Sequence, residues 1–180
     1  MGKTNRYLGA ILNYLYNDII ANVPSHFLRK LFLRCFNKSI SKECIILRRV
    51  KFYNFWNIEI GAHSIINQGC VLDCRRYSII IGENVDVGPY TKIWTLGHDP
   101  DDNGHGLYGG RVELHDHVWV ASSVTILPNI SLGKGAVVAA GSVVVRDVQK
   151  KEIVAGNPAR VIRKRNNSLN YIIKFSPLLE

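Results

Sequence analysis

Histidine is the side chain best suited to take up a proton near neutral pH, and the chain has six histidines. They are His26, His63, His98, His105, His115 and His117. His98 stands in the run TLGHDP, where a regular repeat gives way to a long irregular stretch. We therefore expect His98 to face a cleft beside ordered backbone, as a general base must.

Thiols are a second source of nucleophilic chemistry, and the chain contains Cys35, Cys44, Cys70 and Cys74. We expect free thiols, because a chain of 180 residues does not need disulfides for stability and we expect no export. The four cysteines also lack the close paired spacing of a zinc site. An acyl-bearing Cys70 or Cys74 stays open as an alternative to base catalysis.

A cationic run near the C-terminus could hold a phosphorylated ligand. In AGNPARVIRKR, Pro158 fixes the backbone just before Arg160, and Arg163, Lys164 and Arg165 follow closely. A charge run is most often a solvated face. This run comes directly after the last repeat, so we predict that it binds the phosphates of a ligand.

These candidates lie in or beside a repeat of six residues. The units are IGAHSI, INQGCV and LDCRRY from Ile60, then IGENVD, VGPYTK and IWTLGH from Ile81, and LHDHVW, VASSVT, ILPNIS, LGKGAV, VAAGSV and VVRDVQ from Leu114. The first position is aliphatic in all twelve units, and the fifth is usually small or β-branched. The Gly, Pro and β-branched content predicts short strands with tight turns rather than a helix.

Three such units can close one triangular coil, with the first residue pointing inward and the fifth near a corner. We expect four coils, at residues 60–77, 81–98, 114–131 and 132–149, with interruptions at 78–80 and 99–113. Stacked coils bury a continuous core that no single coil could bury alone. The pattern therefore predicts a parallel β-helix but does not fix its hand.

The two ends differ from the repeat. We divide the chain into an N-terminal segment 1–51, the β-helix domain 52–149 with its loop at 99–113, and a basic C-terminal segment 150–180 whose apolar tail runs from Tyr171 to Leu179. In residues 7–36, apolar residues recur at helical spacing on both sides of Pro24, which predicts two amphipathic helices. They could pack on the β-helix or a neighbouring subunit, or rest their Arg29, Lys30 and Arg34 face on a membrane.

Charge is divided unevenly along the chain. Residues 1–51 carry ten Lys/Arg and two Asp/Glu, residues 52–149 six and ten, and residues 150–180 seven and two. An acidic centre between basic ends does not fit a nucleic-acid-binding module, whose recognition element is itself basic. No apolar run reaches the ~18 to 20 residues of a spanning helix, and we expect a cytoplasmic protein with possible peripheral membrane contact.

About half of the chain resembles the hexapeptide-repeat acyltransferases, in their maltose and galactoside O-acetyltransferase branch. The resemblance rests on WTLGHDP, a loop with GLYGG, and HVWVASSVTILPNISLGKGAVVAAGSVV, in that order. NVPSHFLRKLF, FWNIEIG, INQGCVLDCR and GHDPDD extend it to the colanic-acid and capsule O-acetyltransferases of bacteria. The resemblance implies a left-handed β-helix, a homotrimer with active sites between subunits, and direct transfer from acetyl-CoA, without a metal, to a sugar hydroxyl in surface-polysaccharide synthesis.

The same resemblance implies roles for individual residues. His98 would be the catalytic base, Asn67 would hold the acceptor and the reacting acetyl group, and Asp73 would touch the acceptor's hydroxyls. The residues implied to bind acetyl-CoA are Ser122 and Ala140 along the pantetheine, Trp119 in the adjoining wall, and Arg160 and Arg163 at the nucleotide end.

Other functions stay open on sequence grounds. The chain could acetylate a small free sugar or an amino group, or it could be an inactive scaffold trimer. A zinc enzyme of the γ-carbonic-anhydrase type would need three converging imidazoles, and His115 and His117 have no third partner at the required spacing. The acceptor is not identified, and its specificity should lie in residues 67–76 and 99–113.

Overall fold

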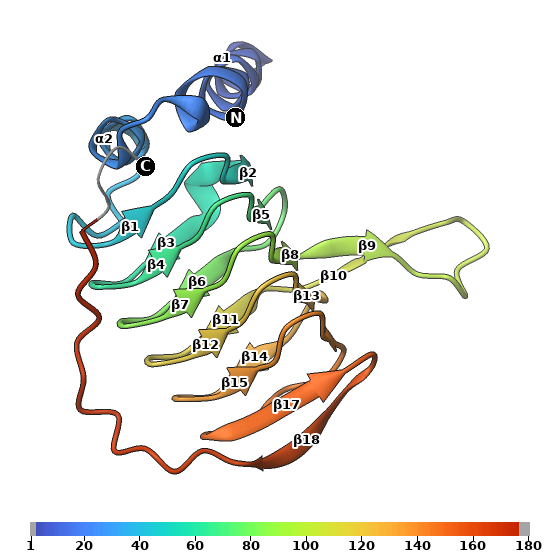
Figure 1. Ribbon diagram of the computed structural model, residues 1–180. Helices are drawn as coiled ribbons and strands as arrows, with labels where there is room; N and C mark the ends of the chain where they lie inside the picture. Colours follow the sequence, from blue (N-terminus) through green and yellow to red (C-terminus); the bar gives the residue numbers. More distant parts are fainter. Residues whose placement is uncertain (1–2, 177–180) are drawn as a thin grey trace.

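The computed structural model describes residues 3–176, and it is a parallel β-helix whose stacked coils form a three-sided column (Figure 1). The first face holds β3 (Ile58–Ile60), β6 (Ile79–Ile81), β11 (Val112–Leu114) and β14 (Ser131–Leu132). The second face holds β1 (Ile45–Ile46), β4 (Ile65–Ile66), β7 (Asp86–Val87), β12 (Trp119–Val120), β15 (Val137–Val138), β17 (Glu152–Gly156) and β18 (Ala159–Lys164). The third face holds β2 (Lys51–Tyr53), β5 (Val71–Asp73), β8 (Lys92–Trp94), β13 (Thr125–Ile126) and β16 (Val143–Val144).

The six-residue repeat sets which side chains enter the column. The first residue is at most 2% exposed in all twelve predicted units, so the inward orientation is confirmed. The fifth residue is buried in every unit except two, which carry Arg76 and Gly97 there. The chain leaves its regular coil at both of these places.

The fourth residue of many units turns the corner with left-handed backbone. His63, Asn84, Tyr90 and His117 all have φ between 55 and 61°, and Gly69 has a φ of 70°. Asn and Gly adopt this conformation most readily, whereas other side chains occupy it at a cost. The corner therefore explains why Gly and Asn recur in the repeat.

The β-helix begins at Ile40, before the expected boundary at residue 52, so one further coil precedes the repeat that starts at Ile60. Ile40 bridges to Ile60, β1 pairs with β4, and β2 pairs with β5. Ile40, Ile46 and Phe52 are buried and stand six residues apart, as first positions of three more units. Two extra residues, Ile58 and Glu59, separate this coil from the repeat at Ile60, and several charged side chains mask its period.

Two helices cover the open end of the first coil (Figure 1). They are α1 (Lys3–Tyr14) and α2 (His26–Phe36), joined through a π-helical turn at Leu15–Ile19 and a 3-10 turn at Ile20–Asn22; a further 3-10 turn spans Phe55–Asn57. Ser25 begins α2 by accepting a hydrogen bond from the Leu28 amide. The prediction of two amphipathic helices interrupted near Pro24 is confirmed.

The basic face of α2 points into the protein. Arg29 is fully buried and donates to the Ile46 carbonyl at 3.1 Å from two of its nitrogens. Lys30 donates to the Lys42 and Cys44 carbonyls, and Arg34 donates to that of Ile40. A first coil has no preceding coil to pair its backbone, and each bond from a charged donor contributes about 1.5 to 3 kcal/mol. The interpretation that this face rests on a membrane is therefore wrong.

Residues 165–176, here called the tail segment, run along the corner between the first and second faces (Figure 1). Arg165 donates to the His117 and Gly135 carbonyls, and Leu169 covers Gly135. Nearer the first coil, the Ile173 amide donates to the Asn84 side chain at 2.9 Å. The tail segment thus joins the coils that carry Gly135, His117 and Asn84, and the remainder of the predicted apolar tail, residues 177–179, lies outside the described residues.

His117 is the titratable group enclosed by this contact. It is 8% exposed and its ring meets the Tyr171 ring edge to face at 4.9 Å. Burial lowers its pKa from the ordinary 6.5, Lys134 and Arg165 lower it further, and Asp116 and Glu83 act in the opposite sense. The folded protein therefore favours the neutral imidazole.

Neutral His117 predicts a stability that weakens in acid. The unfolded chain takes up this proton more readily, so the contribution is complete above the ordinary pKa of 6.5 and is lost as the pH falls through the folded value. Between about pH 7.5 and about pH 5, urea unfolding of His117→Asn should lose less stability than the parent, and Asn suits the left-handed backbone. The matched control is His115→Asn, at a more exposed histidine, and its loss of stability with falling pH should equal that of the parent. If all three proteins show the same pH dependence of stability, His117 is not its source.

Candidate functional site

His98 stands on an arm that projects from the column (Figure 1). After β8 the chain forms β9 (Leu96–His98) and returns through β10 (Leu107–Gly109), which pairs antiparallel with it. A Cβ atom at Gly109 would lie 2.4 Å from the Thr95 carbonyl oxygen, and one at Gly110 would collide with Asn129. The two glycines of GLYGG therefore let the arm leave and rejoin the column closely. The sequence predicted an irregular loop here rather than a hairpin.

The His98 ring is exposed and held in one orientation. Its Nδ1 lies 2.9 Å from the carbonyl oxygen of His105, and the two imidazoles stack at 3.8 Å with an angle of 8° between them. A carbonyl oxygen can only accept, so Nδ1 carries the hydrogen and donates it. Nε2 then keeps its lone pair, as a general base requires.

Three of the predicted acetyl-CoA and acceptor positions line one corner of the column, between the second and third faces. Asn67, Ser122 and Ala140 occupy this corner on different coils, which backbone hydrogen bonds join: the Asn67 amide donates to Val87, and the Gly141 amide donates to Ser122. Trp119 lies beside the corner on the second face with 47% of its surface exposed. These residues form a continuous strip, here called the corner strip.

Arg160 and Arg163 lie at the lower end of the same face. They belong to β18, where Arg160 is opposite Ala155 and Arg163 is opposite Ile153. Both are exposed, and each donates a hydrogen bond to a backbone carbonyl of its own strand. Two cationic side chains therefore remain on the surface next to the corner strip.

Asp86 is a site residue that the sequence reasoning missed. Asn67 donates from Nδ2 to an Asp86 carboxylate oxygen at 2.9 Å and to the Val87 carbonyl at 3.0 Å. Burial raises the pKa of Asp86, and the bond from Asn67 partly opposes that rise. This pair fixes the amide plane of Asn67. The available signal was a carboxylate at the outward sixth position of IGENVD, directly opposite Trp119 in the next coil.

Asp73 lies at a different corner, between the third and first faces. It is fully buried, and its two carboxylate oxygens accept from Nε and Nη2 of Arg75 at 2.9 Å each. Thr95 also donates to its backbone carbonyl at 2.6 Å. These bonds hold the turn from which the arm departs. A contact between Asp73 and the acceptor stays a prediction.

Within one chain, His98 is not brought to the corner strip. The arm leaves from the corner between the third and first faces, while Asn67 marks the opposite end of the third face. Asn67 and Asp73 are six positions apart along the chain, with the corner at Gly69 and strand β5 between them. Within one column, His98 and the corner strip therefore lie at different corners.

The cysteines are poorly suited to nucleophilic catalysis. Cys70 and Cys74 are buried, and burial raises the pKa of Cys70 to about 12 and raises that of Cys74 as well. All four thiols are free, and Cys35 is the exposed one. Among residues 3–176, no three His, Cys, Asp or Glu side chains gather as they would around a metal ion.

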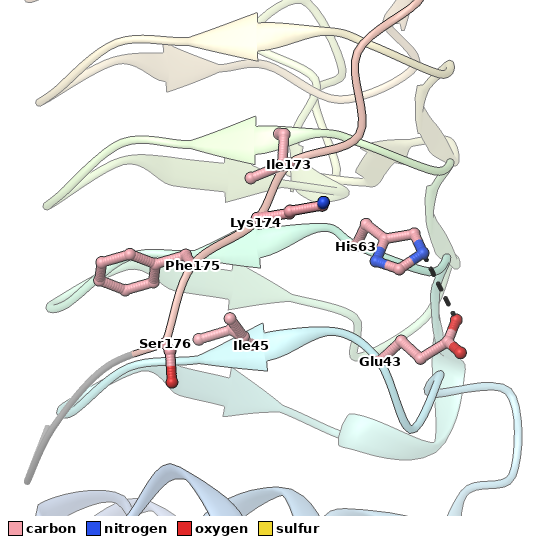
Figure 2. A pocket seen from close by; sticks show the side chains of 7 residues that line it. All are labelled: Glu43, Ile45, His63, Ile173, Lys174, Phe175 and Ser176. Atoms are coloured by element: carbon pink, nitrogen blue, oxygen red, sulfur yellow. Dashed lines mark ion pairs between the residues drawn. The ribbon is translucent and has the colours of Figure 1, made fainter.

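A cavity of about 370 Å³ lies beneath the tail segment, away from His98 and from the corner strip. Figure 2 shows Glu43 beside His63, and it shows Lys174 and Ser176 on the tail segment that covers the cavity. The Glu43 Oε2 and His63 Nε2 atoms are 3.7 Å apart. The cavity is lined by Glu43, Ile45, His63, Ile173, Lys174, Phe175 and Ser176. It is a gap between the tail segment and the first coils, and it contains none of the predicted site residues.

Comparison with known proteins identifies relatives of this chain. The chain is 45% identical over 113 residues to nodulation protein L of Rhizobium meliloti, covering 61% of this chain and 60% of that protein. It is 32% identical over 115 residues to the galactoside O-acetyltransferase of Escherichia coli, covering 62% and 56%. The chain thus matches little more than half the length of these relatives. No family model matches it.

The likeness in structure extends further. A hexapeptide-repeat acetyltransferase of Vibrio cholerae, crystallised with acetyl coenzyme A, superposes with a TM-score of 0.76 at 27% identity, covering 90% of this chain and 87% of that one. The predicted left-handed β-helix with N-terminal helices is thereby confirmed. None of the helices within residues 3–176 has the length and apolar character to cross a bilayer. The chain is thus similar in sequence to a galactoside O-acetyltransferase and to nodulation protein L, and similar in fold to a hexapeptide-repeat acetyltransferase.

Proposed function

We propose that the protein transfers an acetyl group from acetyl-CoA to a sugar hydroxyl. The observation that carries this proposal is the orientation of His98, whose Nδ1 is committed to the His105 carbonyl and whose Nε2 is left to accept a proton. Relatives named as a galactoside O-acetyltransferase and as an acetyltransferase bound to acetyl coenzyme A support the reaction class.

The reaction is a direct transfer. Nε2 of His98 takes the proton of the acceptor hydroxyl as the oxygen attacks the thioester carbonyl carbon. The C–S bond then breaks, and the thiolate of CoA leaves with the proton that the imidazolium returns. We assign to Asn67, which Asp86 orients, the role of holding the acceptor and the acetyl oxygen during the transfer. The buried state of Cys70 and Cys74 argues against an acetylated enzyme.

Removing the base should slow the chemical step and spare cofactor binding. We expect His98→Ala to lower turnover by roughly 10² to 10⁴, the usual contribution of a positioned general base. The affinity for acetyl-CoA should stay near that of the parent in calorimetry. Near-normal turnover would refute the role of His98, and an acetyl group trapped on a cysteine would favour covalent catalysis.

The donor is proposed to lie along the corner strip. Ser122 and Ala140 would adjoin the pantetheine, Trp119 would form the wall beside it, and Arg160 and Arg163 would meet the phosphates. This order follows the strip from the exposed arginines of β18 toward Asn67. Binding of CoA to the purified protein would also separate an enzyme from an inactive scaffold.

The arginines should act on the cofactor and not on the acceptor. Because a charge-assisted contact is worth ~1.5 to 3 kcal/mol, Arg160→Ala or Arg163→Ala should weaken CoA binding by roughly 10- to 100-fold. Turnover at saturating acetyl-CoA should survive. If one arginine meets the ribose phosphate, its variant should discriminate less than the parent between CoA and dephospho-CoA. If the ratio of the affinities for CoA and dephospho-CoA is unchanged in both variants, the basic run is a solvated surface and not a binding site for this phosphate.

We further propose a homotrimer in which the arm of one column reaches the corner strip of its neighbour. The separation of His98 from Asn67 along the third face favours this arrangement, since a second chain is needed to complete the site. Cyclic assemblies repeat one heterologous contact, so three equivalent sites would result.

A shared site predicts complementation between two inactive variants. Co-expressed His98→Ala and Asn67→Ala chains should form mixed trimers in which about a quarter of the interfaces carry both native residues. Activity should then recover to roughly a quarter of the parent's, while each variant alone stays inactive. Light scattering would establish the assembly. Mixed trimers without recovered activity would contradict a site built from two chains.

The acceptor is proposed to be a sugar of a surface-polysaccharide precursor, presented at a membrane. The two helices and the turn between them expose a set of large apolar side chains: Tyr7, Leu8, Ile11, Tyr14, Ile19, Phe27, Leu28, Leu31 and Phe36. Exposed Lys38, Lys42 and Arg49 lie near the same end of the column. An apolar face with a basic rim suits the interface of an anionic membrane.

Membrane contact should depend on the exposed apolar side chains of that surface. The parent should float with vesicles that contain an anionic lipid, and Phe27→Ser with Leu31→Ser should not. Because both side chains are exposed, the double variant should fold and keep its acetyl transfer to a water-soluble acceptor. If the parent and the double variant float equally well, this surface does not bind the membrane. A screen of free sugars, amino sugars and lipid-linked precursors would then identify the acceptor class.

A further inference from the structure

The tip of the arm is organised around one carboxylate. The Asp102 side chain accepts from the amides of Gly104 at 2.8 Å and Gly106 at 3.0 Å, and its carbonyl accepts from the His105 amide at 2.9 Å. Three successive amides are therefore directed at a single residue. The loop is exposed and rich in glycine, so these bonds provide its order.

The three bonds set the backbone of His105. This residue has a φ of 53°, which a histidine adopts only at some cost. In that conformation its carbonyl oxygen meets Nδ1 of His98 at 2.9 Å, and its ring lies flat against the His98 ring. A side chain at position 106 is excluded, because a Cβ atom there would lie 2.0 Å from the Asp102 carboxylate. The turn therefore directs the His105 carbonyl oxygen toward Nδ1 of His98.

We propose that Asp102 and the His105 carbonyl are positioning residues that hold His98 in its Nδ1–H tautomer, with Nε2 free toward the reacting hydroxyl. Asp102 stands four residues after His98, and its carboxylate accepts from backbone amides rather than from the imidazole, so it touches no reacting atom in this scheme. It acts through the turn, by keeping residue 105 in left-handed backbone. The catalytic consequence rests on the proposed function, whereas the choice of tautomer does not.

The reason for such a device is chemical. Both tautomers of a neutral imidazole are populated in water, and only one places the lone pair on Nε2. An exposed histidine on a projecting arm lacks the buried carboxylate that often selects the tautomer in active sites. In this protein a backbone carbonyl makes the selection, and Asp102 determines where that carbonyl points.

The test is the tautomer itself, read by nitrogen NMR of protein labelled with ¹⁵N-histidine. At a pH where the ring is neutral, His98 of the parent, assigned by its loss in His98→Gln, should show the Nδ1–H pattern. In Asp102→Ala the signal should move toward the Nε2–H pattern, and turnover should fall by roughly 10-fold with the KM for acetyl-CoA unchanged. Asp101→Ala is the matched control, because Asp101 holds none of these amides. It should change neither quantity.

Variants of His105 separate its backbone from its ring. His105→Asn keeps a residue that tolerates left-handed backbone and should retain the Nδ1–H pattern. His105→Val opposes that backbone and should behave as Asp102→Ala does. An unchanged tautomer in Asp102→Ala and His105→Val would overturn the proposal. A parent with the Nδ1–H pattern but no acetyl transfer would overturn the proposed function and leave the positioning intact.

Discussion

The structure depends on closing each coil around an inward aliphatic side chain. A six-residue face provides one such residue, and the fourth residue turns the corner in left-handed backbone. No coil can stand alone, because its backbone amides and carbonyls find partners only in the coils above and below. The interior is therefore filled, and chemistry is confined to the corners, the outer faces and the places where the repeat is interrupted.

The ends of such a stack need separate solutions. At the first coil, Arg29, Lys30 and Arg34 of α2 donate to the carbonyls that a further coil would have met. At the last coil, β17 turns back as β18, so that the second face ends in an antiparallel strand. The same turn brings Arg160 and Arg163 to the end of the corner strip. Termination of the fold and presentation of cationic side chains are thus one piece of structure.

Much of the fold was predictable from the sequence because the repeat acts residue by residue. Ile60 and the first residue of each later unit point inward, and this can be predicted from the six-residue spacing alone. The first coil escaped detection because Ile58 and Glu59 break the period and Phe52 takes an aliphatic place. The basic side chains of α2 were assigned to the wrong surroundings, since helical spacing gives a face but not what that face meets.

The site was predictable only in part, for a related reason. Repeat register identifies positions such as Asn67 and His98, but the distance between them follows from how many residues form each face. The Asp86 partner of Asn67 joins two coils and is 19 residues away. The hairpin that carries His98 depends on close backbone approaches at Gly109 and Gly110, which appear only when the coils are stacked. Neither the Asn67–Asp86 bond nor the close approach at the two glycines can be recognised from a short stretch of sequence.

The tail segment changes how the stack can come apart. A column of coils has contacts mainly between neighbours, so it could fray one coil at a time from either end. Arg165 meets His117 across 48 residues of sequence, and Ile173 meets Asn84 across 89. Such contacts close long loops and can form only after the coils that receive them. Once formed, they couple the coil that carries Asn84 to the coils that carry His117 and Gly135, so a chain built from local repeats gains contacts that favour the joint opening of these coils.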